Sequence, residues 1–101
     1  MKEFDEFKER AERFIQNPIK ASSSKDVFIF NNCYCKNQPI VITYNKDNYK
    51  PWFSREKIYR IQIIIYSIMG TYDWIIYTFK TKYKMDEFQK LLDKWIKKNF
   101  R

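Results

Sequence analysis

Lysines occupy every second position where the last apolar run of the chain gives way to a helical pattern. Lys80, Lys82 and Lys84 fall within residues 75–92, which begin with strand-forming residues and end as an amphipathic helix. Ammonium groups at the edge of a sheet can reach phosphates without disturbing the apolar pairing of the strand. Such contacts depend on salt and carry little sequence information. The three lysines therefore indicate a site for a folded polyanion, and RNA that is recognised by its shape requires no more.

The same lysines also have a purely structural interpretation. Charged side chains at the edge of a sheet discourage it from pairing with another sheet. The total charge does not decide between these two interpretations. AT-rich genomes enrich proteins in Lys, Asn, Ile and Tyr, and this chain has that composition, so its net charge of +8 can arise without a polyanion partner. The distribution of charge favours a polyanion, since the segment from Lys80 onward holds eight cations and three acids while residues 1–16 are nearly balanced.

No arrangement of residues in the sequence indicates catalysis or metal binding. Histidine is absent, which removes the commonest general base and the commonest metal ligand. Cys33 and Cys35 form one C-x-C pair, which is half a zinc site at most, and burial as free thiols is the ordinary interpretation. We therefore expect a non-enzymatic protein without a metal ion or a cofactor.

Aromatic residues make up 20% of the chain, more than a core of this size requires. Some of them are therefore expected at the surface, where they contact another protein or stack on nucleic-acid bases. Trp52 and Phe53 are the candidates for a partner interface, because they follow a proline in a polar stretch. Packing back against the core is the more ordinary outcome for such a pair.

The sequence also bears on location. The run "QIIIYSIM" is too short to span a bilayer, and the acidic start "MKEFDEF" lacks the apolar centre of a signal peptide. We expect a cytoplasmic protein, or a nuclear one, without stable membrane insertion.

Two amphipathic helices are expected at the ends of a single domain that comprises residues 1–101. Apolar residues recur at helical spacing over 4–15, and Asn17 and Pro18 end that pattern. A second helical pattern runs over 85–96, with Asp86 and Glu87 expected in its first turn.

Strands are expected between the helices. Residues 27–44 are expected to form a hairpin with a turn at 36–38, and residues 45–56 a long polar loop. Two further strands, 57–69 and 72–81, flank Gly70. This order predicts an α+β fold, α-β-β-β(-β)-α, with an antiparallel sheet and both terminal helices packed on one face. The uncovered face, if apolar and basic, would be a binding surface.

The start of the chain resembles the nine-kilodalton subunit of the signal recognition particle. Residues 6–21, "EFKERAERFIQNPIKA", contain a helix with Phe7, the "AER" step at 11–13 and the "NPIK" turn at 17–20. The end of the chain is similar to the same family, because the strand ending in "FKT" at 79–81 runs directly into the last helix. The two segments cover about a third of the chain.

The chain also departs from that family. Its first strand, "VFIFNNCYC", carries no basic residue, and the middle, roughly 36–56, is longer than in the family. The fourteen-kilodalton sibling shares the fold and has a long loop after its first strand, so it is the alternative relative. The "NPIKA" turn favours the nine-kilodalton subunit.

The resemblance implies a small RNA-binding subunit of the particle's Alu domain. It would pair with its fourteen-kilodalton sibling through their sheets, hold the folded particle RNA on the joint surface and support elongation arrest in co-translational targeting. Lys20 and Lys80 lie in the matching motifs. Lys25, Lys82 and Lys84 are added as RNA-binding residues because they lie near those two in the sequence.

Two other interpretations remain. A basic loop and a C-terminal helix with Trp95 are typical of pleckstrin-homology-like modules that bind phosphoinositides or peptides, although four strands are too few for that barrel. The chain could instead be a structural subunit of a larger assembly, with Trp52, Phe53 and surface tyrosines as its interface. An RNA-recognition-motif sheet is disfavoured, because its glycine-containing aromatic signature is absent.

Overall fold

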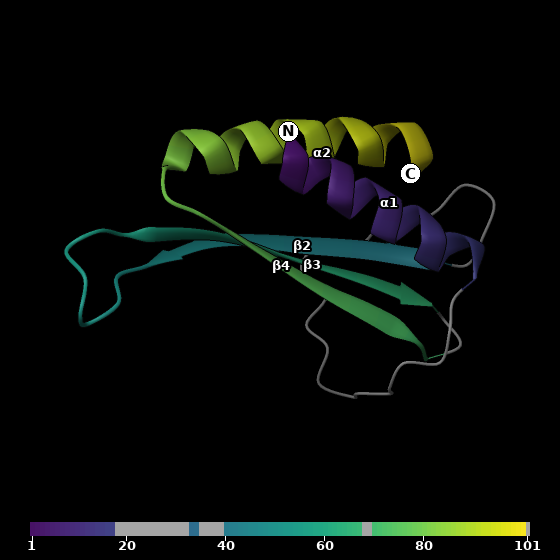
Figure 1. Cartoon of the computed structure of the whole chain (residues 1–101). Helices are drawn as coiled ribbons and strands as arrows, with labels where there is room; N and C mark the ends of the chain where they lie inside the picture. The colour runs from purple at the N-terminus through teal and green to yellow at the C-terminus, as the bar shows by residue number, and fades with distance from the viewer. Residues whose placement is uncertain (18–32, 35–39, 68–69, 101) are drawn as a thin grey trace.

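Two helices cover one face of an antiparallel sheet in the computed structural model, which describes residues 1–17, 33–34, 40–67 and 70–100 (Figure 1). The elements in chain order are α1 (Lys2–Gln16), β1 (Cys33–Tyr34), β2 (Ile40–Tyr49), β3 (Ile58–Ser67), β4 (Tyr72–Phe79) and α2 (Lys82–Asn99). The sheet order is β1-β2-β3-β4, so each strand pairs with the next strand along the chain. This confirms the α+β class and the expected order of elements.

The hydrophobic core fills the space between the helices and the sheet. Phe88 of α2 lies at its centre, with ring centroids 6.1 Å from Phe7 of α1 and 5.5 Å from Phe79 of β4. Tyr77 packs on the same ring, and burial raises the pKa of its phenol to about 12. The core therefore joins both ends of the sequence to the last strand.

Alternation along the strands explains which side chains enter this core. Ile61, Ile63 and Ile65 of β3 are fully buried beneath the helices, while the residues between them point to the other face. Gly70 lies between β3 and β4 with φ of +96°, a conformation that suits glycine, and its N–H donates to the carbonyl of Ser67.

The polar loop expected at 45–56 is shorter in the structure. Residues 45–49 continue β2, and the pairing with β3 runs without interruption from Ile40 with Ser67 to Tyr49 with Ile58. The sequence "NKDNY" conceals this strand because it lacks apolar alternation, and the ladder to β3 supplies its stability instead. The connection is therefore residues 50–57.

Helix α2 begins earlier than the apolar pattern indicates. Its N-cap is Thr81, whose hydroxyl accepts a hydrogen bond of 3.2 Å from the N–H of Lys84. The expectation that Asp86 and Glu87 lie in the first turn is therefore wrong, and Lys82 and Lys84 take those positions.

Of the strand expected at the start of the 27–44 hairpin, the structure describes Cys33 and Tyr34. They form β1 and pair antiparallel with Ile42 and Val41 of β2. The expected turn at 36–38 lies outside the described residues, and so does Cys35.

Polar contacts fix the helices to the sheet. Arg10 of α1 donates two hydrogen bonds to Asp73 of β4, at 2.7 Å from Nε and 2.5 Å from Nη2. Tyr44 of β2 donates to Asp93 of α2 at 2.5 Å. Neither helix combines the length and the apolar character that a membrane span requires, within the chain segments described here.

Candidate nucleic-acid interface

The three lysines at the centre of the sequence argument lie where β4 gives way to α2. Lys80 directly follows β4, and Lys82 and Lys84 lie in the first turn of α2. All three are exposed, and none forms an ion pair with a carboxylate in the described part of the chain. Their ammonium groups are therefore available to a partner.

The strand register brings further cations to this end of the sheet. Tyr49 pairs with Ile58 and Tyr59 pairs with Phe79, so β2, β3 and β4 all terminate here. Neighbouring strands lie about 5 Å apart, which places Lys57 between Lys50 on one side and the segment from Lys80 on the other. We call this group the basic end: Lys50, Arg55, Lys57, Lys80, Lys82 and Lys84.

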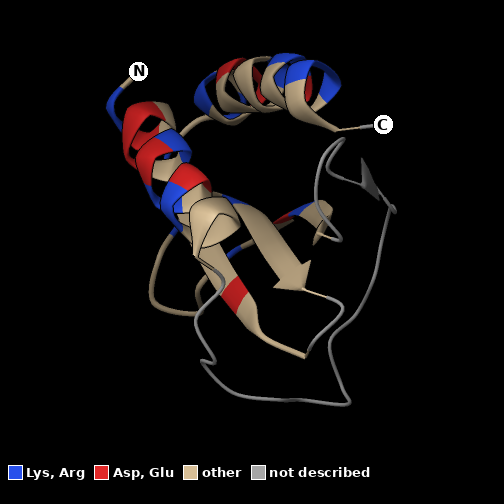
Figure 2. Ribbon diagram, turned by 90° about the vertical axis from the view of Figure 1, so that its right-hand side faces the viewer, with Lys and Arg blue, Asp and Glu red and all other residues tan. Residues whose placement is uncertain are grey.

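Charge at the basic end is strongly one-sided. Residues 50–57 and 80–84 hold its six cations and a single acid, Glu56. By contrast, α1 shows acidic and basic segments interleaved along its length (Figure 2). Among the described residues, the place where the hairpin and the start of α2 meet is therefore a strongly positive region.

Helix stability does not explain the position of Lys82 and Lys84. The N-terminus of a helix carries a partial positive charge, so each cation in the first turn is unfavourable by about 0.3–1 kcal/mol. Asp or Glu there would stabilise α2, and the last turn, which holds Lys97 and Lys98, is the favourable place for lysine. The two lysines therefore reinforce the positive potential of the helix end.

Two aromatic side chains project at the tip of the β2–β3 hairpin. Trp52 is 95% exposed and Phe53 is 75% exposed, so the interpretation that they pack on the core is wrong. The N–H of Ser54 donates to the carbonyl of Pro51 at 3.0 Å, which makes Trp52 and Phe53 the central residues of a tight turn. The hairpin extends past the start of α2, beyond the helices that cover the core (Figure 1).

Another aromatic residue lies among the lysines of α2. Tyr83 is 76% exposed and stands between Lys82 and Lys84 in the sequence. The basic end therefore combines unpaired cations with exposed rings on two separate elements.

The described residues on the helix-free face of the sheet do not form a basic surface. Its outward residues on β2, β3 and β4 include one anion and one cation, Asp47 and Arg60, which pair directly across the two strands. Arg60 donates two hydrogen bonds to Asp47, at 2.8 and 2.6 Å, and these lower the pKa of that carboxyl. The charges of the described residues on this face cancel, so these residues offer phosphates no net attraction.

Exposure on this face varies along the sheet. Val41, Thr43 and Ile64 are buried, whereas Trp74 and Ile76 of β4 are each 51% exposed. Trp74 donates from its indole nitrogen to Gln62 at 3.2 Å. The open apolar part of this face therefore lies on β4, at the edge of the sheet.

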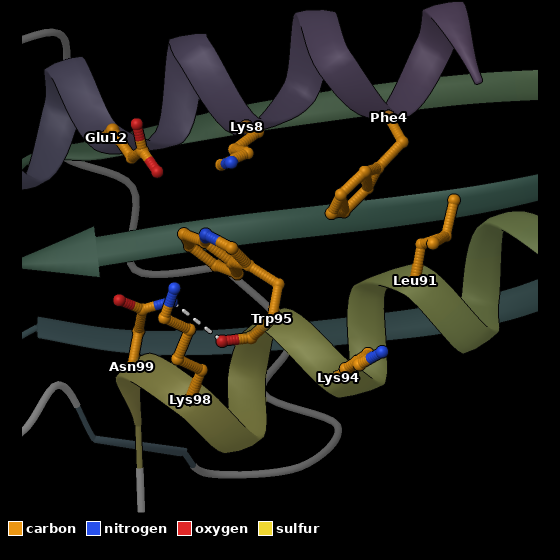
Figure 3. A pocket seen from close by; sticks show the side chains of 8 residues that line it. All are labelled: Phe4, Lys8, Glu12, Leu91, Lys94, Trp95, Lys98 and Asn99. Carbon is orange, nitrogen blue, oxygen red and sulfur yellow. Dashed lines mark hydrogen bonds between the residues drawn. The ribbon is translucent and has the colours of Figure 1, made fainter.

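A small cleft separates the two helices toward the C-terminal part of α2 (Figure 3). Its volume is about 260 Å³, and its lining residues are Phe4, Lys8, Glu12, Leu91, Lys94, Trp95, Lys98 and Asn99. The indole of Trp95 reaches from α2 toward α1, and its buried N–H has no hydrogen-bond partner among the described residues. The lining of this cleft holds one acid, Glu12, and three cations, Lys8, Lys94 and Lys98, so the net charge of the cleft is smaller than that of the basic end.

Part of the basic end was among the residues that the sequence predicted for RNA binding. Lys80, Lys82 and Lys84 lie together as expected, whereas Lys20 and Lys25 lie outside the described residues. Lys50, Arg55 and Lys57 were not expected there, because only the full length of β2 brings them beside the start of α2. The sequence feature that could have indicated them is that these cations flank Trp52 and Phe53 on both sides.

No family model, curated protein or solved structure matches this chain. No cluster of three or more Asp, Glu or Cys side chains that could hold a metal ion occurs in the ranges that the structure describes. The geometry and charge of the basic end are therefore the observations that bear on function.

Proposed function

We propose that the chain is an RNA-binding subunit that holds a folded RNA by its phosphates. The observation that carries the proposal is the convergence of six exposed cations from the hairpin and the start of α2 at one end of the molecule. Lysine contacts to phosphate supply affinity that is sensitive to salt and indifferent to base sequence. A compact RNA presents enough phosphate density to engage several of these cations at once.

The finer proposal is a subunit of the Alu domain of the signal recognition particle, of the nine-kilodalton type. The segments that resemble this family lie in α1 with the residues after it and in β4 with the start of α2. In this role the chain works in the cytoplasm, catalyses no reaction and pairs with the fourteen-kilodalton sibling. The exposed Trp74 and Ile76 on edge strand β4 support such a pairing, because an open apolar edge favours association with another sheet.

The proposal is tested by the salt dependence of RNA binding. The triple variant Lys80→Gln, Lys82→Gln and Lys84→Gln is compared with the native chain on an RNA hairpin over a range of salt concentrations. Each lost phosphate contact lowers the slope of log affinity against log salt by about one, so we expect a decrease of about three.

The matched control removes the same charge from the other end of α2. We expect Lys94→Gln, Lys97→Gln and Lys98→Gln to keep most of the native slope. Equal losses in the two triple variants would show that only total charge matters and would refute the site. Binding to vesicles with anionic lipid, without binding to RNA, would instead support the phosphoinositide-binding alternative.

A further inference from the structure

We infer that the tip of the β2–β3 hairpin stacks on unpaired bases, so that the chain prefers RNA in which an unpaired nucleotide adjoins a duplex. This inference rests on the proposed RNA binding by the basic end and names the kind of RNA that the site selects. Trp52 and Phe53 are the stacking residues.

The rings of Trp52 and Phe53 at the tip are exposed to solvent and are not buried. At 95% exposure both faces of the Trp52 indole are accessible, and the Phe53 ring meets it at 88° with centroids 5.8 Å apart. Large apolar side chains with this exposure contribute little to the core, and aromatic residues are enriched at recognition surfaces. The two rings thus form a surface on which bases could stack and which does not pack in the hydrophobic core.

The turn holds these rings in place before any ligand binds. Pro51 restricts the backbone that enters it, and the hydrogen bond from Ser54 to Pro51 closes it. The hydroxyl of Ser54 also accepts a bond of 3.1 Å from the N–H of Glu56, which fixes the residues that leave the turn. A tip that is already ordered loses little conformational entropy on binding, which favours stacking.

Charge at the tip matches the backbone that carries the bases. Lys50 precedes the turn by one residue and Arg55 follows it by one, and neither has an ion pair within the described part of the chain. Proteins that bind unpaired strands combine such cations with aromatic rings, because each base offers a ring face and a phosphate.

The position of the tip indicates an unpaired nucleotide beside a duplex. The bases of an A-form duplex are stacked inside it, and its deep major groove is too narrow for side chains to read. Bulges and loops present the free ring faces that Trp52 requires. Lys82 and Lys84, on the neighbouring element, can meanwhile contact the phosphates of the adjoining duplex.

The test uses two blunt-ended RNA duplexes of the same sequence, of which one carries a single bulged 2-aminopurine. We expect the native chain to bind the bulged duplex about tenfold more tightly than the fully paired one and to quench the 2-aminopurine fluorescence. We expect Trp52→Ala with Phe53→Ala to lose both the preference and the quenching while keeping the affinity for the fully paired duplex. The matched control, Trp74→Ala, removes an aromatic ring from the sheet face and should retain both.

The outcomes separate this inference from the proposed function. Equal affinity for both duplexes, with the lysine triple variant weakened on each, would overturn the stacking and leave RNA binding in place. No binding to either duplex would overturn both. Binding instead to vesicles of phosphatidylcholine and phosphatidylserine, lost in the Trp52 and Phe53 variant, would reassign the tip to a lipid surface. Circular dichroism of each variant confirms that the fold is retained.

Discussion

At the scale of single residues, the first turn of α2 shows a conflict between stability and binding. Thr81 caps the helix, and Lys84 occupies the third position after the cap, where glutamate would complete a capping box. The local interactions therefore favour an acid at the position that holds a lysine. Such a departure from the locally stable choice is expected at a functional site.

This conflict gives a prediction for Lys82→Glu and Lys84→Glu. Each change should increase the free energy of unfolding by about 0.3–1 kcal/mol, because it replaces a cation with an anion at the positive end of the helix. The same changes should greatly weaken RNA binding, because they place negative charge beside phosphate. Thermal denaturation and RNA titration of the same samples measure the two effects. A loss of stability with unchanged affinity would contradict both parts.

At the scale of elements, the apolar periodicity of the sequence predicted both helices and the central strands. Phe7, Ala11 and Phe14 recur at helical spacing because burial selects those positions, whereas a run of β-branched and aromatic residues, apolar on both faces of the strand, marks β3. The second half of β2 could not be predicted in this way. Its residues 45–49 are polar, and the ladder to β3 and the pair between Asp47 and Arg60 stabilise them as a strand.

The contribution of that pair is testable through its pH dependence. Arg60 lowers the pKa of Asp47 below its ordinary value of 3.8, so the stabilisation is present above 3.8 and is lost as the pH falls through the lower folded pKa. We expect Asp47→Asn to decrease the free energy of unfolding by about 0.5–1 kcal/mol at neutral pH. The difference from the native chain should shrink in acid, as measured by denaturant unfolding across pH.

A matched control is available on α1. Glu9 pairs with Arg13 at 3.1 Å, but both side chains are largely exposed, so Glu9→Gln should change stability by less than about 0.5 kcal/mol. If Asp47→Asn has no larger effect at neutral pH, or if its effect persists unchanged at low pH, the pair does not stabilise the hairpin.

At the scale of the whole molecule, the cations of the basic end lie apart from the helix-free face of the sheet. Among the described residues, the helix-free face has balanced charge and exposes apolar side chains on β4, while six cations meet where the hairpin and the start of α2 lie together. The lysines of α2 could be predicted from their spacing alone. Lys50, Arg55 and Lys57 could not, since their place beside Lys80 depends on strand pairing over residues far apart in the sequence. Under the proposed function, this separation would leave β4 free for a protein partner while the basic end binds RNA.

The most direct test of the account is to map RNA contacts by NMR on the isotopically labelled chain. During titration with an RNA hairpin, we predict that the largest amide shift changes fall in residues 50–57 and 80–84. Signals of β4 from Tyr72 to Thr78 and of the cleft between the helices should change little. Changes centred on Trp74 and Ile76, or on the cleft beside Trp95, with none at the basic end, would contradict the central claim.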